Sequence, residues 1–376
     1  MGENLSRRGV IAGLAGLASG AAAFTGAPGE QPFAADPSLR SRRRPNILVI
    51  LGDDLGWADL SSYGSTHIKT PHLDGLAAGG IRFTDGYSAA AVCSPTRIAL
   101  YTGRYPGRLP GGLPEPIGAH TPDNGIPPTH PTLASLLKRV GYATAMFGKW
   151  HCGFLPWFSP LRSGWDEFFG NATALFHFDG GSLDIYRKMV ENMDRNVGKV
   201  LAALRETGQD RDTIVLFSSD NGGERFSYYW PLSGGKGNLN EGGIRVPNIL
   251  RWPARLRSHQ VSHEPVVTQD WTATLLELAG ARPDPAYPGD GVSLAGYLLR
   301  GDRAPARDLF WRTHDAGALR RGNWKFLRDK TTAEDTLFDI RVDPREQADR
   351  SAANPALVAE LSARWESIDA NLLPYT

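Results

Sequence analysis

Hydrophobic residues gather in short continuous runs that predict strands, and the runs at 46–51 and 213–218 predict buried ones. Residues 46–51 form one such run, residues 143–147 a second and residues 213–218 a third. Each run has the length of a strand, and polar residues or glycines bound it. The runs therefore predict strands of a parallel sheet with both faces covered.

Amphipathic segments alternate with these runs and predict helices. Apolar residues recur with helical spacing over 132–140, and Gly141 supplies a stop signal. A longer amphipathic segment covers 183–207, with an expected apolar face of Met189, Met193, Val197, Val200 and Leu204. The alternation predicts an α/β fold with a doubly wound, mostly parallel sheet flanked by helices. Such folds bind ligands beyond the carboxyl ends of their strands.

The pattern changes near residue 300. Short, aromatic-rich pieces of strand character follow at 309–312, 324–328 and 336–340, and a last helix is expected over 355–368. We interpret residues 45–299 as the main α/β domain and residues 300–376 as a small α+β C-terminal subdomain. Residues 105–131 are rich in glycine and proline and predict a long surface excursion.

The N-terminal residues 1–35 are typical of a targeting signal. Arg7-Arg8 precedes a weakly apolar stretch rich in glycine and alanine, as in twin-arginine (Tat) signals. Residues 36–44 are interpreted as a basic, solvated linker. We expect export through the Tat translocon to the bacterial periplasm or the extracellular space. No apolar run of membrane length follows, so stable membrane insertion is not expected.

Composition excludes some classes of function. The 41 Lys and Arg residues balance 40 Asp and Glu residues, which leaves no net field for holding nucleic acid or an anionic membrane. An anionic substrate must therefore be bound by a few well-placed cations. The chain has only two cysteines, Cys93 and Cys152, too few for a disulfide framework. Cys152 is expected to be a packed or semi-exposed free thiol.

Oxygen donors stand at the ends of two predicted strands. Asp53 and Asp54 follow the first strand, and Asp220 and Asn221 follow the third. Carboxylate and amide oxygens are ligands for Ca²⁺ or Mg²⁺ rather than for a soft metal. Either pair alone is as compatible with a loop cap, but the two together predict a cation site.

The segment from Cys93 to Arg97, with the sequence Cys-Ser-Pro-Thr-Arg, is the most informative of the chain. On physical grounds Cys93 is either a candidate nucleophile, whose thiolate Arg97 favours, or a buried structural cysteine. The segment continues to Thr102-Gly103-Arg104, and together the two match the signature C-x-P-S/T-R followed after four residues by T-G-R.

With this signature the sequence resembles the formylglycine-dependent, arylsulfatase-like sulfatases of the alkaline phosphatase superfamily. Further family motifs stand in order between about Arg44 and Leu361, among them RPNILVILGDDLGWADLSSYG, GYATAMFGKWHCG, VLFSSDNGG, GGKGNLNEGGIRVP and GNWKFLRD. The resemblance implies an alkaline phosphatase-like fold and hydrolysis of a carbohydrate or aryl sulfate ester.

The resemblance also implies two cofactors. Cys93 corresponds to the residue that a formylglycine-generating enzyme oxidises to formylglycine (3-oxoalanine), whose aldehyde hydrates to a diol. A divalent cation, Ca²⁺ or alternatively Mg²⁺, would be held by Asp53, Asp54, Asp220, Asn221 and the oxygen of the residue derived from Cys93.

The same resemblance implies the roles of four further residues. Arg97 would hold and polarise the formylglycine. Lys149 and Lys236 would neutralise sulfate oxygens in the transition state. His151 would act as the base that removes a hydroxyl proton.

Residues 171–182 depart from the family pattern. Relatives carry several tens of further residues here, including a histidine that contacts sulfate, and no residue of this chain matches it by motif. His177 is a candidate substitute. Trp157, Trp230, Trp311 and His314 are candidates for lining a sugar pocket, although core or subdomain packing explains tryptophans more often. Two alternative functions stay open: a phosphonate monoester or phosphodiester hydrolase, and a catalytically impaired sulfatase-like binding protein.

Overall fold

The structure is a computed structural model that describes residues 44–171 and 181–375. The expected Tat signal of residues 1–35, the linker up to residue 43 and His177 lie outside the described residues. Among the helices of the described part, none is long and apolar enough to cross a membrane.

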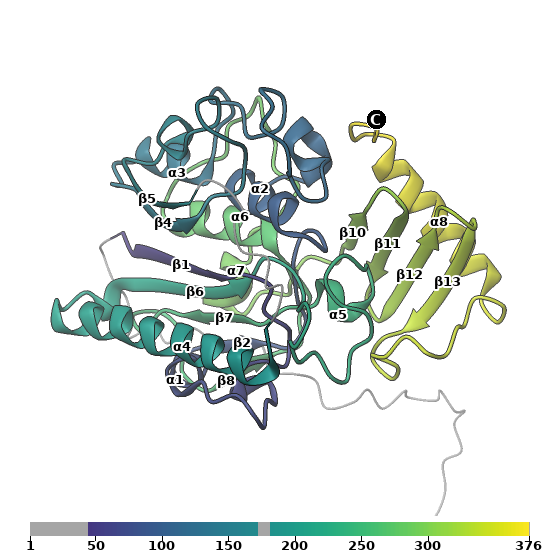
Figure 1. The fold of residues 1–376 in the computed structure, drawn as a ribbon, viewed down its shortest axis with the longest axis horizontal. Helices are drawn as coiled ribbons and strands as arrows, with labels where there is room; N and C mark the ends of the chain where they lie inside the picture. Colours follow the sequence, from purple (N-terminus) through teal and green to yellow (C-terminus); the bar gives the residue numbers. More distant parts are fainter. Residues whose placement is uncertain (1–43, 172–180, 376) are drawn as a thin grey trace, which may run out of the picture. The chain divides into compact units, whose positions relative to one another are not determined.

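The centre of the fold is a five-stranded sheet with the strand order β1-β6-β7-β2-β8 (Figure 1). Its strands are β1 (Asn46–Gly52), β2 (Ile81–Phe83), β6 (Thr213–Ser219), β7 (Asn248–Arg251) and β8 (Gln260–Ser262). Strand β7 is antiparallel to both β6 and β2, whereas the pairs β1/β6 and β2/β8 are parallel. Four strands therefore share one direction, which confirms an α/β fold with a mostly parallel sheet.

Helices cover both faces of this sheet and enclose two separate apolar cores. One core contains α2 (Cys93–Thr102), α3 (Leu133–Lys138), α6 (Thr268–Leu278) and α7 (Ala295–Arg300). The other contains α1 (Pro71–Ala78) and α4 (Leu183–Glu206). Alternate residues of β1 contribute to the two cores, Val49 to the first and Ile50 to the second. This is the period of two expected of a strand with two covered faces.

Two expectations about burial were wrong in detail. Strand β1 is half-buried rather than buried, because it lies at the edge of the sheet and pairs only with β6. In α4 the buried face contains Val190, Val197 and Leu201, whereas Met189 and Val200 are 40% and 44% exposed. The helix is rotated so that a slightly different stripe contacts the core.

Two short parallel pairs stand apart from the central sheet. Strand β4 (Ala145–Lys149) pairs with β5 (Glu167–Asn171), and β3 (Gly86–Tyr87) pairs with β9 (Val266–Val267). Phe147 and Phe169 are cross-strand partners, and both are largely exposed. The strand predicted at 143–147 therefore exists, displaced by two residues.

The prediction of a surface excursion over 105–131 was wrong for its apolar residues. Leu109, Ile117 and Ile126 are buried in the main core. The backbone N–H of Ile126 donates to the carbonyl of Cys152. The segment contains the short 3₁₀ helices η2 (Pro106–Arg108) and η3 (Pro110–Gly112). Its glycines and prolines shape a folded loop that covers part of the core.

The C-terminal part contains a four-stranded antiparallel sheet and one helix. The strands β10 (Asp308–Arg312), β11 (Ala316–Arg321), β12 (Trp324–Asp329) and β13 (Glu334–Asp339) are neighbours in chain order. Helix α8 (Pro355–Asp369) packs Leu361 and Trp365 against this sheet. Whether residues 300–376 form a subdomain of their own stays a prediction. The remaining short helices are η1 (Ser61–Tyr63), η4 (Pro160–Ser163), η5 (Asp210–Asp212) and α5 (Glu241–Ile244).

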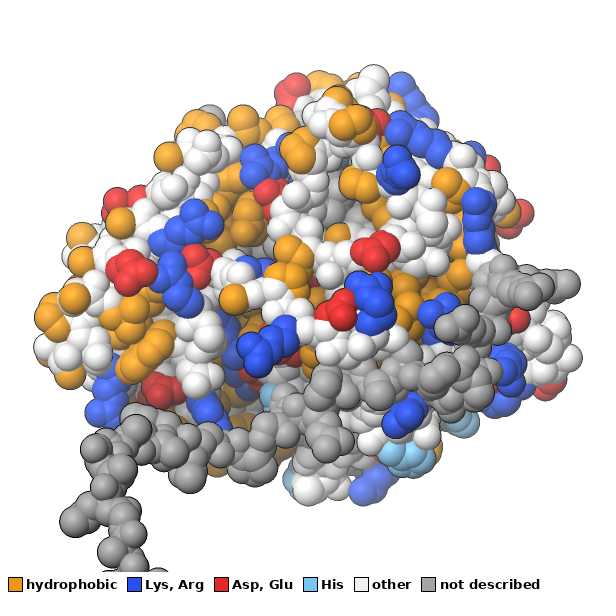
Figure 2. Space-filling model, turned by 180° about the vertical axis from the view of Figure 1, so that it is seen from behind, with side chains coloured by type: hydrophobic (Ala, Val, Ile, Leu, Met, Phe, Trp, Pro, Cys, Tyr) orange, Lys and Arg blue, Asp and Glu red, His pale blue; other side chains and the backbone are white. Residues whose placement is uncertain are grey.

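Charged side chains of both signs are mixed on the surface of the described residues. On the face shown in Figure 2, Lys and Arg side chains stand beside Asp and Glu, and no continuous basic area extends over it. This mixture is expected from the near-zero net charge of the sequence.

Candidate active site

The parallel register of β1 and β6 brings the predicted oxygen donors together. Gly52 and Ser219 are partners at the last paired position, so Asp53 and Asp220 leave adjacent strands at the same edge of the sheet. The backbone N–H of Asp54 donates to Asp220 Oδ1 at 3.2 Å. Asn221 Nδ2 donates to Asp54 Oδ1 at 2.8 Å. The two strand ends thus form one cluster of oxygen atoms.

Cys93 lies at the first turn of α2 and points at this cluster. The preceding Val92 is extended, and Gly103 ends the helix in the left-handed region with φ 71°. Every residue of the helix is buried, which fixes its position in the core. Cys93 Sγ donates to Asp54 Oδ1 at 3.6 Å. The positive end of the helix macrodipole therefore faces the carboxylates.

Arg97 is one turn further along α2 and connects the two strand ends. Its guanidinium donates to Asp220 Oδ2 through Nε at 2.9 Å and through Nη2 at 2.6 Å. The same Nη2 reaches Asp53 Oδ1 at 3.0 Å. Because Arg97 is buried, these charge-assisted bonds fix the carboxylates in place.

Two lysines approach the cluster from different segments. Lys149 ends β4, and its Nζ lies 2.6 Å from Asp53 Oδ1. Lys236 lies in the loop before α5, and its Nζ lies 2.6 Å from Asp54 Oδ2. It also pairs with Glu224, at 3.1 Å. Sequence analysis missed Glu224, although it follows the Asp220-Asn221-Gly-Gly segment directly.

His151 follows β4 and is buried beside these residues. Its backbone has a φ of 51°, in the left-handed region. His151 Nε2 is 3.0 Å from the carbonyl of Ile117, a bond that requires the proton on Nε2. Its Nδ1 has no hydrogen-bond partner among the described residues. Burial lowers the pKa of His151 to about 4, so the ring is neutral near pH 7 and Nδ1 is free to accept a proton.

The carboxylates differ in the ease with which they ionise. Burial raises the pKa of Asp220 to about 6, and the nearby Asp53 and Asp54 add to the rise against the opposing effect of Arg97. Burial also acts to raise the pKa of Asp53, but Arg97 and Lys149 outweigh it and hold this pKa well below its usual range. The fully buried Asp220 is therefore the carboxylate whose ionised form would gain most from a further positive charge nearby.

The environment of Cys93 corrects one expectation. Burial raises the pKa of its thiol, and the carboxylates of Asp220 and Asp54 raise it further. The guanidinium of Arg97 donates to Asp220 and Asp53, and its positive charge does not offset the net rise of the Cys93 pKa. Arg97 and a Cys93 thiolate do attract each other, as predicted, but burial and the carboxylates outweigh this attraction. This site therefore does not favour an unmodified thiolate nucleophile.

The donor set fits a hard divalent cation. Single ligand atoms of Asp53, Asp54, Cys93 and Asp220 all lie within 4.8 Å of one another. Asn221 Oδ1 is buried without a hydrogen-bond partner among the described residues, although a buried amide oxygen normally has one. The cluster offers carboxylate and amide oxygens and no imidazole, which suits Ca²⁺ or Mg²⁺.

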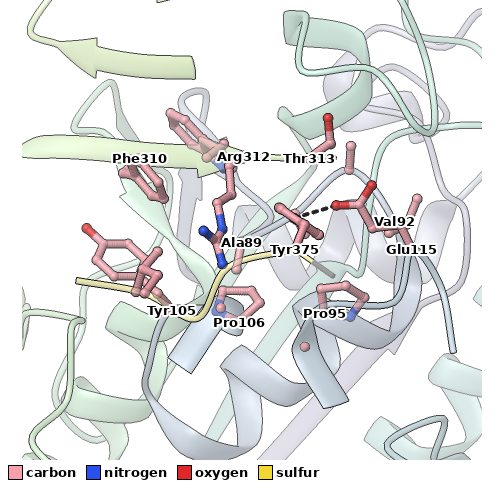
Figure 3. A pocket seen from close by; sticks show the side chains of 16 residues that line it. Ala89, Val92, Pro95, Tyr105, Pro106, Glu115, Phe310, Arg312, Thr313 and Tyr375 are labelled. Atoms are coloured by element: carbon pink, nitrogen blue, oxygen red, sulfur yellow. Dashed lines mark hydrogen bonds between the residues drawn. The ribbon is translucent and has the colours of Figure 1, made fainter. Parts of the chain in front are cut away.

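A small cavity of about 20 Å³, room for a single water molecule, lies beside the first turn of α2 (Figure 3). Val92 and Pro95, which flank Cys93, line it together with Thr313 after β10. The hydroxyl of Tyr375 donates to Glu115 at its edge, as the dashed line in Figure 3 marks.

The aromatic candidates for a sugar pocket divide into two kinds. Trp311 is buried and donates from its indole to the carbonyl of Ser88, so packing accounts for it. Trp157 and Trp230 are 38% and 55% exposed, and His314 is exposed beside Asp315. Cys152 is a buried free thiol, as expected.

Comparisons with known proteins point to one family. A family model described as Sulfatase matches residues 45–183 and 178–281. N-acetylgalactosamine-6-sulfatase of Rattus norvegicus is 31% identical over 75% of this chain and 71% of its own length. Arylsulfatase A of Homo sapiens is 30% identical over 90% of this chain and 85% of its own. A solved structure of Ps i-CgsB in complex with k-i-k-neocarrahexaose has a TM-score of 0.77, at 26% identity over 86% of this chain and 92% of its own.

The comparisons also bear on the shortened segment. The two family matches overlap at residues 178–183, at the end of the stretch 171–182 where the sequence departs from the family pattern. The alignment with the rat relative spans 370 positions but takes in only 75% of this 376-residue chain. The relative therefore carries residues that this chain lacks.

Proposed function

Because the chain belongs to the sulfatase family and is a sulfuric ester hydrolase, we propose that it removes sulfate from a carbohydrate, using a formylglycine derived from Cys93 and a divalent cation. The observation that carries the proposal is the convergence of Asp53, Asp54 and Asp220 on Cys93 at the N-terminus of α2. The carbohydrate preference is supported by the relatives, which include an N-acetylgalactosamine-6-sulfatase and a structure bound to a neocarrahexaose.

The formylglycine would supply the nucleophile, and the divalent cation would activate it. The formylglycine at position 93 offers the hydroxyl of a hydrated aldehyde, and a Ca²⁺ or Mg²⁺ ion held by Asp53, Asp54, Asp220 and Asn221 offers Lewis acidity. All other functions in the proposal belong to side chains of the chain itself.

Three positively charged side chains, those of Arg97, Lys149 and Lys236, prepare the site for the anionic sulfate group. Arg97, held by Asp220 and Asp53, keeps position 93 and the carboxylates in one arrangement. Lys149 and Lys236 approach from two segments, and both are only partly exposed. They bind the sulfate oxygens and stabilise the charge that shifts onto the leaving oxygen in the transition state.

His151 is the proton acceptor of the proposal. Its Nε2 proton is fixed on the carbonyl of Ile117, so Nδ1 carries the lone pair. Because its pKa is about 4, the ring is in the accepting form over the whole neutral range. Ile117 belongs to the 105–131 segment, which thereby orients the base.

The proposal includes the route by which the enzyme matures. A formylglycine-generating enzyme acts on the Cys93 segment, and the Tat translocon exports the folded chain to the periplasm or beyond. Arg7-Arg8 and the Gly/Ala-rich stretch after it support the second step.

The test begins with the chemical state of Cys93. The full chain is produced together with a formylglycine-generating enzyme. The mass of its tryptic peptide Phe83 to Arg97 is then determined by mass spectrometry. We expect the mass of an aldehyde or its hydrate. We also expect turnover of 4-nitrophenyl sulfate and of a sulfated oligosaccharide, and much slower turnover of a 4-nitrophenyl phosphonate monoester.

Three outcomes contradict parts of this proposal. An unmodified thiol at Cys93, with a control sulfatase modified in the same cells, contradicts the formylglycine. Faster hydrolysis of the phosphonate ester favours the phosphonate hydrolase. A modified protein that binds cation and sulfate without any turnover is the impaired binding protein.

A further inference from the structure

A second cluster of buried charges lies between the C-terminal sheet and the loop that carries Lys236. Lys325 of β12 is fully buried, and so are the side chains of Glu241 and Glu346. Lys325 Nζ lies 2.9 Å from Glu241 Oε1 and 2.8 Å from Glu346 Oε1. Figure 1 shows α5, which begins at Glu241, beside the sheet of β10 to β13.

Glu346 has a second set of contacts, which connect it to the segment that carries Lys236. Its Oε2 accepts from the backbone N–H of Glu241 at 2.7 Å and from the hydroxyl of Ser233 at 2.8 Å. Its backbone has a φ of 53°, a conformation that non-glycine residues seldom adopt. One carboxylate thus binds both ends of the segment 233–241.

Lys236 lies inside this segment. The carbonyl of Ser233 accepts from the N–H of Gly242 at 2.6 Å, which closes the segment into a loop. Within the loop, the N–H of Lys236 donates to Gly223, and the N–H of Gly237 donates to Ala91. The loop is therefore fixed on one side by the strand end and the Cys93 segment, and on the other by Glu346.

Stability alone does not account for this arrangement. A fully buried group of charges contributes little net stability, because desolvation offsets most of the attraction between them. Apolar side chains of similar size would fill the same volume at no loss. Charged groups have a different advantage here, since the hydrogen bonds from Lys325 to Glu241 and those that Glu346 Oε2 accepts hold these residues at fixed points.

We propose that Lys325, Glu346 and Ser233 are positioning residues for Lys236. In this proposal, which rests on the proposed function, the C-terminal sheet holds the loop so that the Lys236 ammonium stays at the sulfate position. Lys325 fixes Glu346, Glu346 fixes Ser233, and Ser233 fixes the start of the loop.

The variant Ser233→Ala tests the last contact without leaving a buried charge unpaired. The matched control is Ser61→Ala, since the Ser61 hydroxyl also donates to a carboxylate at 2.8 Å, that of Asp74, outside the site. The primary measurement is the rate at which trace acetic anhydride acetylates Lys236, quantified by mass spectrometry with Lys149 of the same molecule as the reference. We expect Ser233→Ala to raise the Lys236 rate about fivefold, the effect of one lost hydrogen bond, and Ser61→Ala to change neither rate.

Enzyme kinetics supply the second measurement. We expect Ser233→Ala to lower kcat/KM for 4-nitrophenyl sulfate about fivefold, and Ser61→Ala to leave it unchanged. In a Lys236→Met background Ser233→Ala should add less than a twofold loss, because it acts through that lysine. A full fivefold loss in that background, or an unchanged labelling rate of Lys236, overturns the proposal. If the wild-type enzyme has no turnover, the proposed function fails, and the labelling experiment still decides the positioning role.

Discussion

The site cluster and the Lys325 cluster both pair lysines with carboxylates but differ in their access to water. In the site, the side chain of Asp53 is 50% exposed, and those of Lys149, Lys236 and Asp54 are 18% to 24% exposed. In the second cluster Lys325, Glu241 and Glu346 are fully buried. An ammonium group near water can exchange its carboxylate partner for a substrate anion, whereas a sealed one cannot. Partly exposed charges can therefore bind a substrate anion, whereas fully buried charges can only keep neighbouring segments in place.

The largest expected effect is on the chemistry of the open cluster. Cys93→Ala should lower kcat/KM by about 10⁴-fold or more, since it removes the group that becomes the nucleophile. The matched control Cys152→Ala removes the other buried thiol and should leave kcat/KM within about threefold of wild type, at a cost of about 1 kcal/mol in unfolding free energy. Steady-state kinetics on 4-nitrophenyl sulfate measure both. Equal losses in the two variants would show that packing around α2 explains the Cys93 result.

The next effect is on the stability of the sealed cluster. Lys325→Met leaves Glu346 buried without a cation and leaves Glu241 with Arg245 alone, and the unfolding free energy should fall by about 3–5 kcal/mol. Lys236→Met removes a partly exposed ammonium and should cost less than about 1 kcal/mol. Urea denaturation followed by circular dichroism measures the difference. Similar losses for the two methionine variants would remove the distinction between the clusters.

The same Lys236→Met variant, whose expected effect on stability is small, should have a large effect on kcat/KM. Loss of one cation from the transition state should lower kcat/KM by about 10²- to 10³-fold. Lys199→Met, on the exposed face of α4, serves as control and should have wild-type kinetics. A Lys236→Met enzyme within threefold of wild type would exclude this lysine from the site.

The smallest expected effect is the pH dependence that His151 introduces. Its folded-state pKa of about 4 is below the ordinary value of 6.5, so folding favours the neutral ring. Its contribution to stability is complete above pH 6.5 and is lost as the pH falls toward 4, by at most about 3 kcal/mol. Between pH 7 and pH 4 the wild type should therefore lose up to about 3 kcal/mol more unfolding free energy than His151→Gln, which lacks the titrating ring. With the cation bound, so that Asp220 stays ionised, the acid limb of kcat/KM should lie near pH 4. A limb near 6.5 under these conditions would contradict the buried environment of His151.

Two strands of the central sheet, β1 and β6, and the C-terminal helix were predictable because these elements have strong local patterns. Strand β6 is a continuous apolar run, and helix α8 begins at a proline after a polar segment. Strand β11 was not predicted, since its residues Ala316–Arg321 include little hydrophobic pattern and gain their partners only from β10 and β12. The burial of Ile117 and Ile126 was hidden by the glycines and prolines around them.

The site was predictable where chain order and sheet geometry coincide. Asp53 and Asp220 follow parallel strands, and this alone places them side by side. The pairing of Lys149 with Asp53 and of Lys236 with Asp54 was not predictable, because it depends on where β4 and the loop before α5 fold back. Lys325 gave no signal at all, since a lysine in a strand normally faces water.

The contact between Ser233 and Glu346 also has a consequence for biosynthesis. The two residues are 113 positions apart in the chain. At a translation rate of about 5–20 residues per second, the ribosome needs roughly 5–20 s to make the intervening stretch. During this time the nascent chain already contains the carboxylates of both strand ends, while the segment around Lys236 lacks its contact with Glu346. If the positioning proposal holds, the Lys236 loop reaches its final arrangement only at the end of translation, and a chain released before Glu346 would have both strand-end carboxylates but lack this contact to Ser233.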